Sequence, residues 1–151
     1  MKVKKTIFNT GFSEIVHKRI KRDYSQEVSY AAQKLVAQCE EGLKIYERIK
    51  TEKRRRTIRA IRTRMKIERD GLFEFMRFVV NRKKKLEGFT LLNEKKYYNL
   101  TCEYLLPQFA KRINAAHEKA LGDGSVVFTI ELVEKAKKVL VAHNIDVPLP
   151  I

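Results

Sequence analysis

Residues 52–78 read EKRRRTIRAIRTRMKIERDGLFEFMRF, and this stretch decides both the fold class and the surface chemistry of the chain. Residues 48–87 contain sixteen Lys and Arg but only five Asp and Glu. About a quarter of the 151 residues therefore carries +11 of the net charge of +15. Apolar residues in the stretch recur every three or four positions, which is the spacing of one helix face. That face comprises Ile58, Ile61, Met65, Leu72, Phe75, Met76 and Val79. Residues 53–86 are therefore predicted to form an amphipathic helix rather than a disordered basic tail.

A second set of side chains on this predicted helix is cationic. Its members follow one another at i, i+4, i+7, i+11 and i+14, which on a helix forms a stripe about 21 Å long. The stripe comprises Arg55, Arg59, Arg62, Lys66 and Arg69. Like charges at this spacing lower helix stability, and nearby acidic residues are too few to pair with them. We therefore predict a polyanion-binding surface, with nucleic acid as the partner. Its further members are Phe73, Arg77, Arg82, Lys83, Lys84 and Lys85.

Aromatic residues near these cations have two interpretations. Phe73 lies one turn beyond Arg69, where an aromatic ring could stack on a nucleobase. The same ring could instead be buried against a neighbouring helix, and we favour burial. Tyr97 and Tyr98 follow two lysines, and the helical pattern places Tyr98 in the core and Tyr97 outside.

The rest of the chain also predicts helices joined by short connections. Apolar periodicity, capping residues such as Ser25 and Thr129, and the turn at Gly122–Ser125 support this interpretation. The helices are expected at about 13–22, 25–50, 53–86, 91–121 with a kink at Pro107, and 129–143. Short extended arms are expected at 1–10 and 144–151. These elements predict a single all-α domain over 1–151, a bundle of four to five helices of which one or two are long.

The connection between the second and third of these helices stays open. No Gly or Pro lies between Lys50 and Arg56, so one continuous rod is possible. A turn near Lys50–Lys53 would instead produce an antiparallel hairpin. Further on, Gly88 is expected to end the basic helix, and Thr90 or Asn93 to begin the next.

The sequence offers no pattern typical of catalysis. His17, His117 and His143 lie on three different predicted helices without a Cys or carboxylate at metal-ligand spacing. No Gly-rich phosphate loop is present, so we expect no enzyme activity, catalytic residue, metal or cofactor. Cys39 and Cys102 are expected to be buried free thiols. With no secretory signal and no long apolar run, we expect a cytoplasmic protein without transmembrane association.

The function that these patterns favour is non-enzymatic nucleic-acid binding by an accessory, architectural or ribonucleoprotein subunit. Contacts to the phosphate backbone would dominate, because no motif for reading bases is present, and DNA and RNA are not distinguished. The alternative is a helical oligomerising adaptor that docks on an acidic protein partner or an anionic membrane surface. Homo-oligomerisation or membership of a protein complex is compatible with either function.

Overall fold

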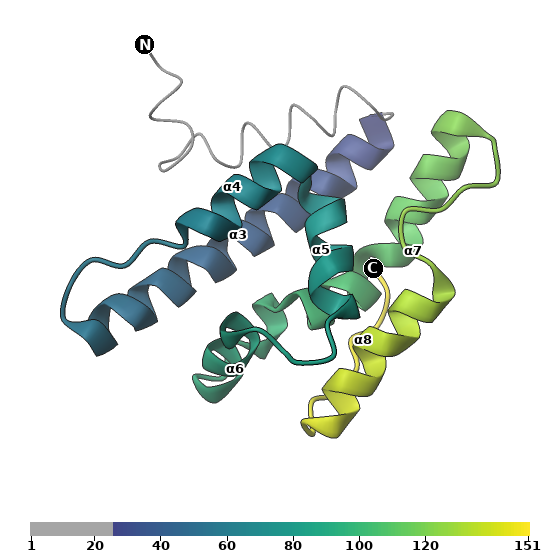
Figure 1. Ribbon diagram of the computed structural model, residues 1–151. Coiled ribbons are helices and arrows are strands. Elements are labelled where there is room, and N and C mark those ends of the chain that lie inside the picture. Colours follow the sequence, from purple (N-terminus) through teal and green to yellow (C-terminus); the bar gives the residue numbers. More distant parts are fainter. Residues whose placement is uncertain (1–25) are drawn as a thin grey trace, which may run out of the picture.

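The computed structural model describes residues 26–151, which form six α-helices and one short 3-10 helix without a β-strand (Figure 1). The helices are α3 (Gln26–Arg54), α4 (Ile61–Asp70), α5 (Leu72–Asn81), α6 (Glu87–Glu94), η1 (Tyr98–Leu100), α7 (Cys102–Leu121) and α8 (Ile130–Ala142). The all-α prediction is confirmed, although the helix count is slightly above four to five. The arm expected at 1–10 and the helix expected at 13–22 lie outside the described residues.

Helices α3 and α4 form an antiparallel hairpin. Helix α4 runs back along α3 after a turn at residues 55–60 (Figure 1). The Ile58 N–H donates to Thr51 Oγ1 at 2.9 Å, so the returning chain is held against the last turns of α3. The chain therefore adopts the hairpin rather than the continuous rod, and its turn lies a few residues beyond Lys50–Lys53.

The single helix predicted over 53–86 is wrong, because Gly71 divides it into α4 and α5. Gly71 has φ +90° and ψ 157°, a conformation that glycine adopts without the steric cost other residues meet. The break changes which residues face inward. Ile61 and Met65, predicted to be apolar contacts, are exposed, while Arg64 and Ile67 are buried.

The predicted helix 91–121 is also divided, between Glu94 and Cys102. Gly88, expected to end a helix, lies inside α6 instead. Helix α7 begins at Cys102, and the preceding Thr101 caps its first turn, because Thr101 Oγ1 accepts the Tyr104 N–H at 3.3 Å. Pro107 lies within α7, and a kink there stays a prediction.

The last helix and the tail are close to their predicted positions. Thr129 Oγ1 accepts the Leu132 N–H at 3.2 Å and caps α8. The residues that precede α8 are held by Asn114 of α7, whose Nδ2 donates to the Phe128 carbonyl at 2.7 Å. Residues 144–151 contain no helix, and the Ile151 N–H donates to the Gln108 carbonyl at 3.1 Å.

Three clusters of buried apolar side chains hold these elements together. The largest joins α3, α4, α5, α7 and α8, with Leu35, Met76 and Leu106 among its fully buried members. A second joins Ile45 and Ile49 of α3 to α6 and η1. The third joins α6 to α8 and the tail. None of the described helices is both long enough and apolar enough to cross a bilayer.

Candidate nucleic-acid interface

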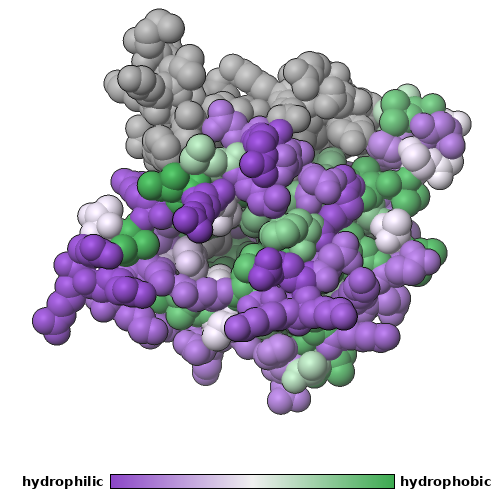
Figure 2. All heavy atoms as spheres, viewed as in Figure 1, coloured by the Kyte–Doolittle hydropathy of each residue, from purple (hydrophilic) through white to green (hydrophobic). Residues whose placement is uncertain are grey.

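The α3–α4 hairpin ends in a turn that concentrates cations at one end of the molecule. Residues 53–62 contain six Lys and Arg and no Asp or Glu. All six side chains are exposed, and we call them the basic tip: Lys53, Arg54, Arg55, Arg56, Arg59 and Arg62. Figure 2 shows hydrophilic side chains gathered at this end of the hairpin, on the left of the view. A cluster of one sign without carboxylates creates a positive potential that attracts polyanions.

The backbone of the turn distributes these cations differently from the predicted straight stripe. Lys53 and Arg54 occupy the last turn of α3, where cations interact favourably with the helix dipole. Arg55 then takes a left-handed conformation with φ +55°, which ends the helix. Arg59 also lies in the turn, and Arg62 lies on the first turn of α4. The structure thus brings Arg55, Arg59 and Arg62 together, but around a turn rather than along one helix face.

A buried ion pair fixes the orientation of the tip. The Glu47 carboxylate accepts hydrogen bonds from Arg64 Nη2 at 2.7 Å, from Arg64 Nε at 3.1 Å and from the Ala60 N–H at 2.7 Å. Burial by itself raises the pKa of Glu47, but these hydrogen bonds outweigh burial and hold the pKa below its usual range. Glu47 therefore stays ionised at neutral pH and ties the beginning of α4 to α3.

The other two members of the predicted stripe bind a carboxylate of their own helix. Arg69 donates to Asp70 from Nε at 2.8 Å and from Nη2 at 2.9 Å, and Lys66 Nζ donates to Asp70 Oδ2 at 3.2 Å. These hydrogen bonds hold the pKa of Asp70 well below its usual range, so its charge is permanent at physiological pH. Lys66 Nζ also lies 4.4 Å from the ring centroid of Phe78. Lys66 and Arg69 are therefore less available to phosphate than the basic tip.

Two further residues of the predicted surface have structural roles. Phe73 is buried and meets Phe128 edge to face, with ring centroids 5.5 Å apart, so its ring is not available for base stacking. Arg77 binds Glu74 at 2.7 Å and the Val127 carbonyl at 2.7 Å. The helical pattern assigned both residues to the cationic surface, but Phe73 is buried and the guanidinium of Arg77 is occupied by these contacts.

Lys85 is held inside the fold by Glu103. Lys85 Nζ lies 3.1 Å from Glu103 Oε2, and the Glu103 side chain is 1% exposed. Burial raises the pKa of Glu103, while the ammonium of Lys85 opposes that rise. Lys85 is thus the partner of a buried carboxylate.

The remaining cations of this segment are exposed in the loop after α5. The Arg82 guanidinium lies 5.5 Å from the Phe78 ring centroid, and its Nε donates to the Lys84 carbonyl at 3.5 Å. Lys83 and Lys84 are exposed. This loop forms a second, smaller cationic surface.

Sequence reasoning missed three members of the basic tip. Lys53, Arg54 and Arg56 do not fall on the helical spacing that defined the stripe, so periodicity did not assign them to the interface. The signal that identifies them is simpler than periodicity: a dense run of cations with no carboxylate among them.

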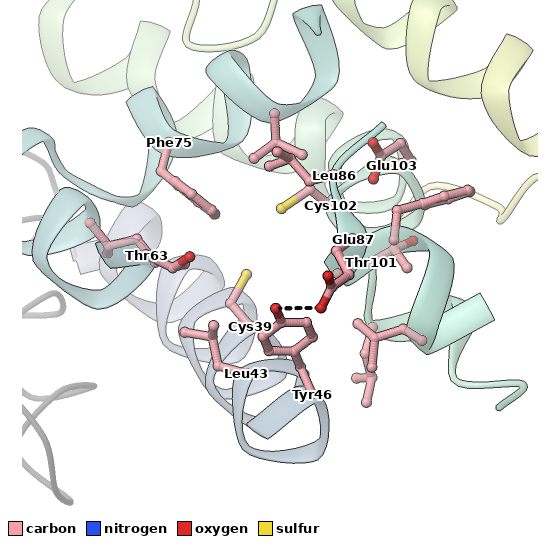
Figure 3. Close-up of a pocket in the computed structure, with 17 residues that line it drawn as sticks. Cys39, Leu43, Tyr46, Thr63, Phe75, Leu86, Glu87, Thr101, Cys102 and Glu103 are labelled. Atoms are coloured by element: carbon pink, nitrogen blue, oxygen red, sulfur yellow. Dashed lines mark hydrogen bonds between the residues drawn. The ribbon is translucent and has the colours of Figure 1, made fainter. Parts of the chain in front are cut away.

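A cavity of about 240 Å³ lies between α3, α4, α5, α6 and α7 (Figure 3). Cys39 and Cys102 are free, as predicted, but they are half-buried residues on the wall of this cavity, and Figure 3 shows their sulfurs pointing into it. Burial raises the pKa of the Cys39 thiol to about 12. Burial, and then the neighbouring Cys39 and Glu103, raise the pKa of Cys102 well above its usual value. Both thiols are therefore protonated at neutral pH, which makes them poor nucleophiles and poor metal ligands.

The histidines within residues 26–151 make local contacts. His117 Nε2 lies 2.8 Å from Ser125 Oγ, and His143 Nδ1 lies 2.9 Å from the Val139 carbonyl. Across the described part of the chain, no group of three His, Cys, Asp or Glu side chains is placed to hold a metal ion. His17 lies outside the described residues.

Comparison with known proteins gives no relative. No protein-family model matches the sequence, and neither the curated proteins nor the solved structures gave a significant match. The function is therefore inferred from the residues and contacts of this chain alone.

Proposed function

We propose that this protein binds nucleic acid through the basic tip, without catalysing a reaction. The observation that supports the proposal is the composition of the tip: six exposed cations and no carboxylate in ten consecutive residues. Five of the six are arginines, whose planar guanidinium groups form paired hydrogen bonds with phosphate oxygens. A phosphodiester backbone supplies such oxygens at regular intervals.

The contrast with other cations of the chain strengthens this proposal. Arg64, Lys66, Arg77 and Lys85 each bind a carboxylate at 3.2 Å or less. No Asp or Glu lies within residues 53–62, and the mutual repulsion of the cations disfavours the turn. The carboxylates that attract Arg54 and Arg59 are Glu87 and Glu47, and these already bind Lys50 and Arg64. A polyanionic partner would remove that repulsion when it binds.

The hairpin presents the tip on a fixed support. Glu47 binds both the Ala60 N–H and the Arg64 guanidinium, and Thr51 binds the Ile58 N–H. These contacts limit the motion of the turn relative to α3. A rigid arrangement of cations loses less conformational entropy on binding than a flexible tail does.

The proposal is tested by fluorescence anisotropy with labelled single-stranded RNA, single-stranded DNA and duplex DNA over a salt series. Replacement of Arg54, Arg56 and Arg59 by Gln removes three charges from the tip. For each phosphate that the variant no longer neutralises, the slope of log affinity against log salt should decrease in magnitude. The expected decrease is about 0.9 for duplex and about 0.7 for single strands.

A matched control removes three charges elsewhere. Lys111, Arg112 and Lys138 are exposed on α7 and α8, and their replacement by Gln lowers the net charge equally. The tip variant should lose far more affinity than the control variant, while its thermal stability stays at or above that of the parent because repulsion within the turn is reduced. Equal losses of affinity in the two variants would show that only the net charge of the protein matters. Absence of binding at low salt would exclude the proposal. Vesicles of anionic lipid in the same assay show whether the tip prefers a membrane surface.

A further inference from the structure

The loop between α6 and α7 places two lysines and two tyrosines in succession. We call Lys95, Lys96, Tyr97 and Tyr98 the aromatic loop. Lys95 and Lys96 are exposed, and they follow the C-terminus of α6, where cations are favoured by the helix dipole. The Tyr97 N–H donates to the Leu92 carbonyl at 2.7 Å, which holds the loop against the end of that helix. Glu94 is the one acidic residue beside the loop in sequence, so the pair of lysines leaves a local excess of positive charge.

The aromatic loop is attached to α3 close to the basic tip. Tyr97 is half-buried against the cluster that contains Ile45 and Ile49, and its hydroxyl accepts a hydrogen bond from Arg48 Nη2 at 3.4 Å. Lys53, the first residue of the tip, follows Ile49 by four residues. It therefore lies on the same face of α3, about 6 Å further along the axis.

A close backbone contact fixes the end of this loop. A Cβ atom on Gly42 of α3 would lie 2.9 Å from the Leu100 carbonyl oxygen, so the absence of a side chain allows η1 to approach α3. The aromatic loop is thus held on the hairpin by contacts at Gly42 and Arg48. The loop is therefore anchored to the same helix that ends in the basic tip.

Tyr98 occupies the exposed position that the sequence pattern had assigned to Tyr97. The Tyr98 side chain is 39% exposed. Its ring packs against Tyr104 of α7, with centroids 5.9 Å apart and an angle of 57° between the planes. An aromatic ring supported by a neighbour yet open to solvent, with two lysines nearby, has the features of a base-stacking platform.

We propose that the partner is a single strand of RNA or DNA that runs from the basic tip to the aromatic loop, where one base stacks on Tyr98. The tip, Arg48, Lys95 and Lys96 contact the phosphates along this path. A single strand fits better than a duplex, because only unpaired bases expose the faces that stack on aromatic side chains. This inference rests on the proposed function and adds the class of nucleic acid and a second contact surface.

The test compares Tyr98→Leu and Tyr98→Phe on four probes of equal length. The probes are a single-stranded oligonucleotide, made both as RNA and as DNA, the corresponding duplex, and an abasic single strand that keeps the phosphates. Loss of one stacked base should weaken single-strand binding by Tyr98→Leu about fivefold to a hundredfold. Tyr98→Phe keeps the ring and should bind as the parent does. The abasic strand should bind both variants equally.

A second measurement reports stacking directly. The chain contains no tryptophan, so Tyr98→Trp introduces a single tryptophan at the proposed platform, which can be excited separately from the tyrosines. Its fluorescence should be quenched by the single strand but not by the abasic strand at matched saturation. Replacement of Lys95 and Lys96 by Gln should weaken binding of both strands, because these residues contact phosphate.

The outcomes separate this inference from the proposed function. If Tyr98→Leu weakens abasic and base-containing strands equally, or leaves both unchanged, stacking is excluded while phosphate binding by the tip stands. If duplex binds more tightly than the single strand, the assignment of the partner is overturned. If replacement of the tip arginines has no effect on any probe, the proposed function itself fails.

Discussion

The Glu47 carboxylate receives two hydrogen bonds from the Arg64 guanidinium, at 2.7 and 3.1 Å, where Arg64 is 2% exposed. Each charge is removed from water and is stabilised mainly by the other. The pair joins the two arms of the hairpin that carries the basic tip. Its consequences for stability can be measured separately from any binding activity.

Arg64→Met should lower the free energy of unfolding by about 3–5 kcal/mol, because it leaves the buried carboxylate of Glu47 without its charge partner. Adding Glu47→Gln should recover part of this loss, since the neutral amide can still accept the Ala60 N–H. Urea unfolding followed by circular dichroism measures both variants. A double variant less stable than Arg64→Met alone would contradict this account of the pair.

Acid should destabilise the parent more than the double variant. The pKa of Glu47 is lower in the folded protein than its ordinary value of 4.5. The stability that Glu47 contributes is therefore complete above about pH 4.5 and is lost as the pH falls through its folded pKa. Urea unfolding at pH 7 and pH 3 should show a larger decrease for the parent than for Glu47→Gln with Arg64→Met. Equal decreases would show that other carboxylates cause the acid sensitivity.

Two glycines inside helices should respond oppositely to alanine. Gly42→Ala places a Cβ 2.9 Å from the Leu100 carbonyl oxygen, so the backbone of η1 must move and stability should fall by about 1–3 kcal/mol. Gly88→Ala meets nothing closer than Tyr46 Cδ1 at 3.9 Å and should gain up to about 1 kcal/mol from helix propensity. Thermal unfolding of both variants measures whether the melting temperature falls for Gly42→Ala and rises for Gly88→Ala. A stabilised Gly42→Ala would mean that α3 and η1 are not in close contact.

The thiols of Cys39 and Cys102 should react slowly in the folded protein. Burial raises the pKa of Cys39 to about 12, so very little thiolate is present at pH 8. A chromogenic disulfide reagent should therefore label neither cysteine quickly until urea unfolds the chain. Labelling of the single variants Cys39→Ser and Cys102→Ser shows which labelling rate belongs to which cysteine. Fast labelling without urea would show that the cavity opens to solvent.

Arg55→Gly should raise stability while weakening nucleic-acid binding. Arg55 has φ +55°, a conformation that costs a non-glycine residue about 1 kcal/mol and that glycine adopts freely. Arg56→Gly is the matched control, because it removes the same charge from a residue without positive φ. Both variants should lose affinity, but only Arg55→Gly should unfold at a higher urea concentration. Equal changes in stability would contradict a specific backbone cost at Arg55.

The sequence predicted the helical class because apolar spacing is a local property of the chain. It also identified where positive charge is concentrated. The division at Gly71 was visible as the only glycine between Gly42 and Gly88, but the helical pattern continued across it and was given more weight. Because the helix is divided, the orientation of α4 about its own axis is independent of that of α5. The inward face of α4 therefore became Arg64 and Ile67 rather than Ile61 and Met65.

The roles of individual cations could not be predicted for a different reason. Arg64 and Lys85 are ordinarily surface residues, and their carboxylate partners, Glu47 and Glu103, lie 17 and 18 positions away in sequence. Only the folded chain brings each pair together. The exposure of Tyr98 likewise depends on how α6, η1 and α7 meet, which periodicity within one segment does not describe.

The exposed cations of the hairpin turn take no part in the three buried clusters. Their identities can therefore change without altering the interior, as long as Ile58 and Ala60 keep their hydrogen bonds to α3. An evolving or engineered version of this chain could exchange the charges of the turn for another binding specificity while the helices beneath it stay the same. The α3–α4 hairpin could therefore serve as a scaffold onto which other binding residues are grafted.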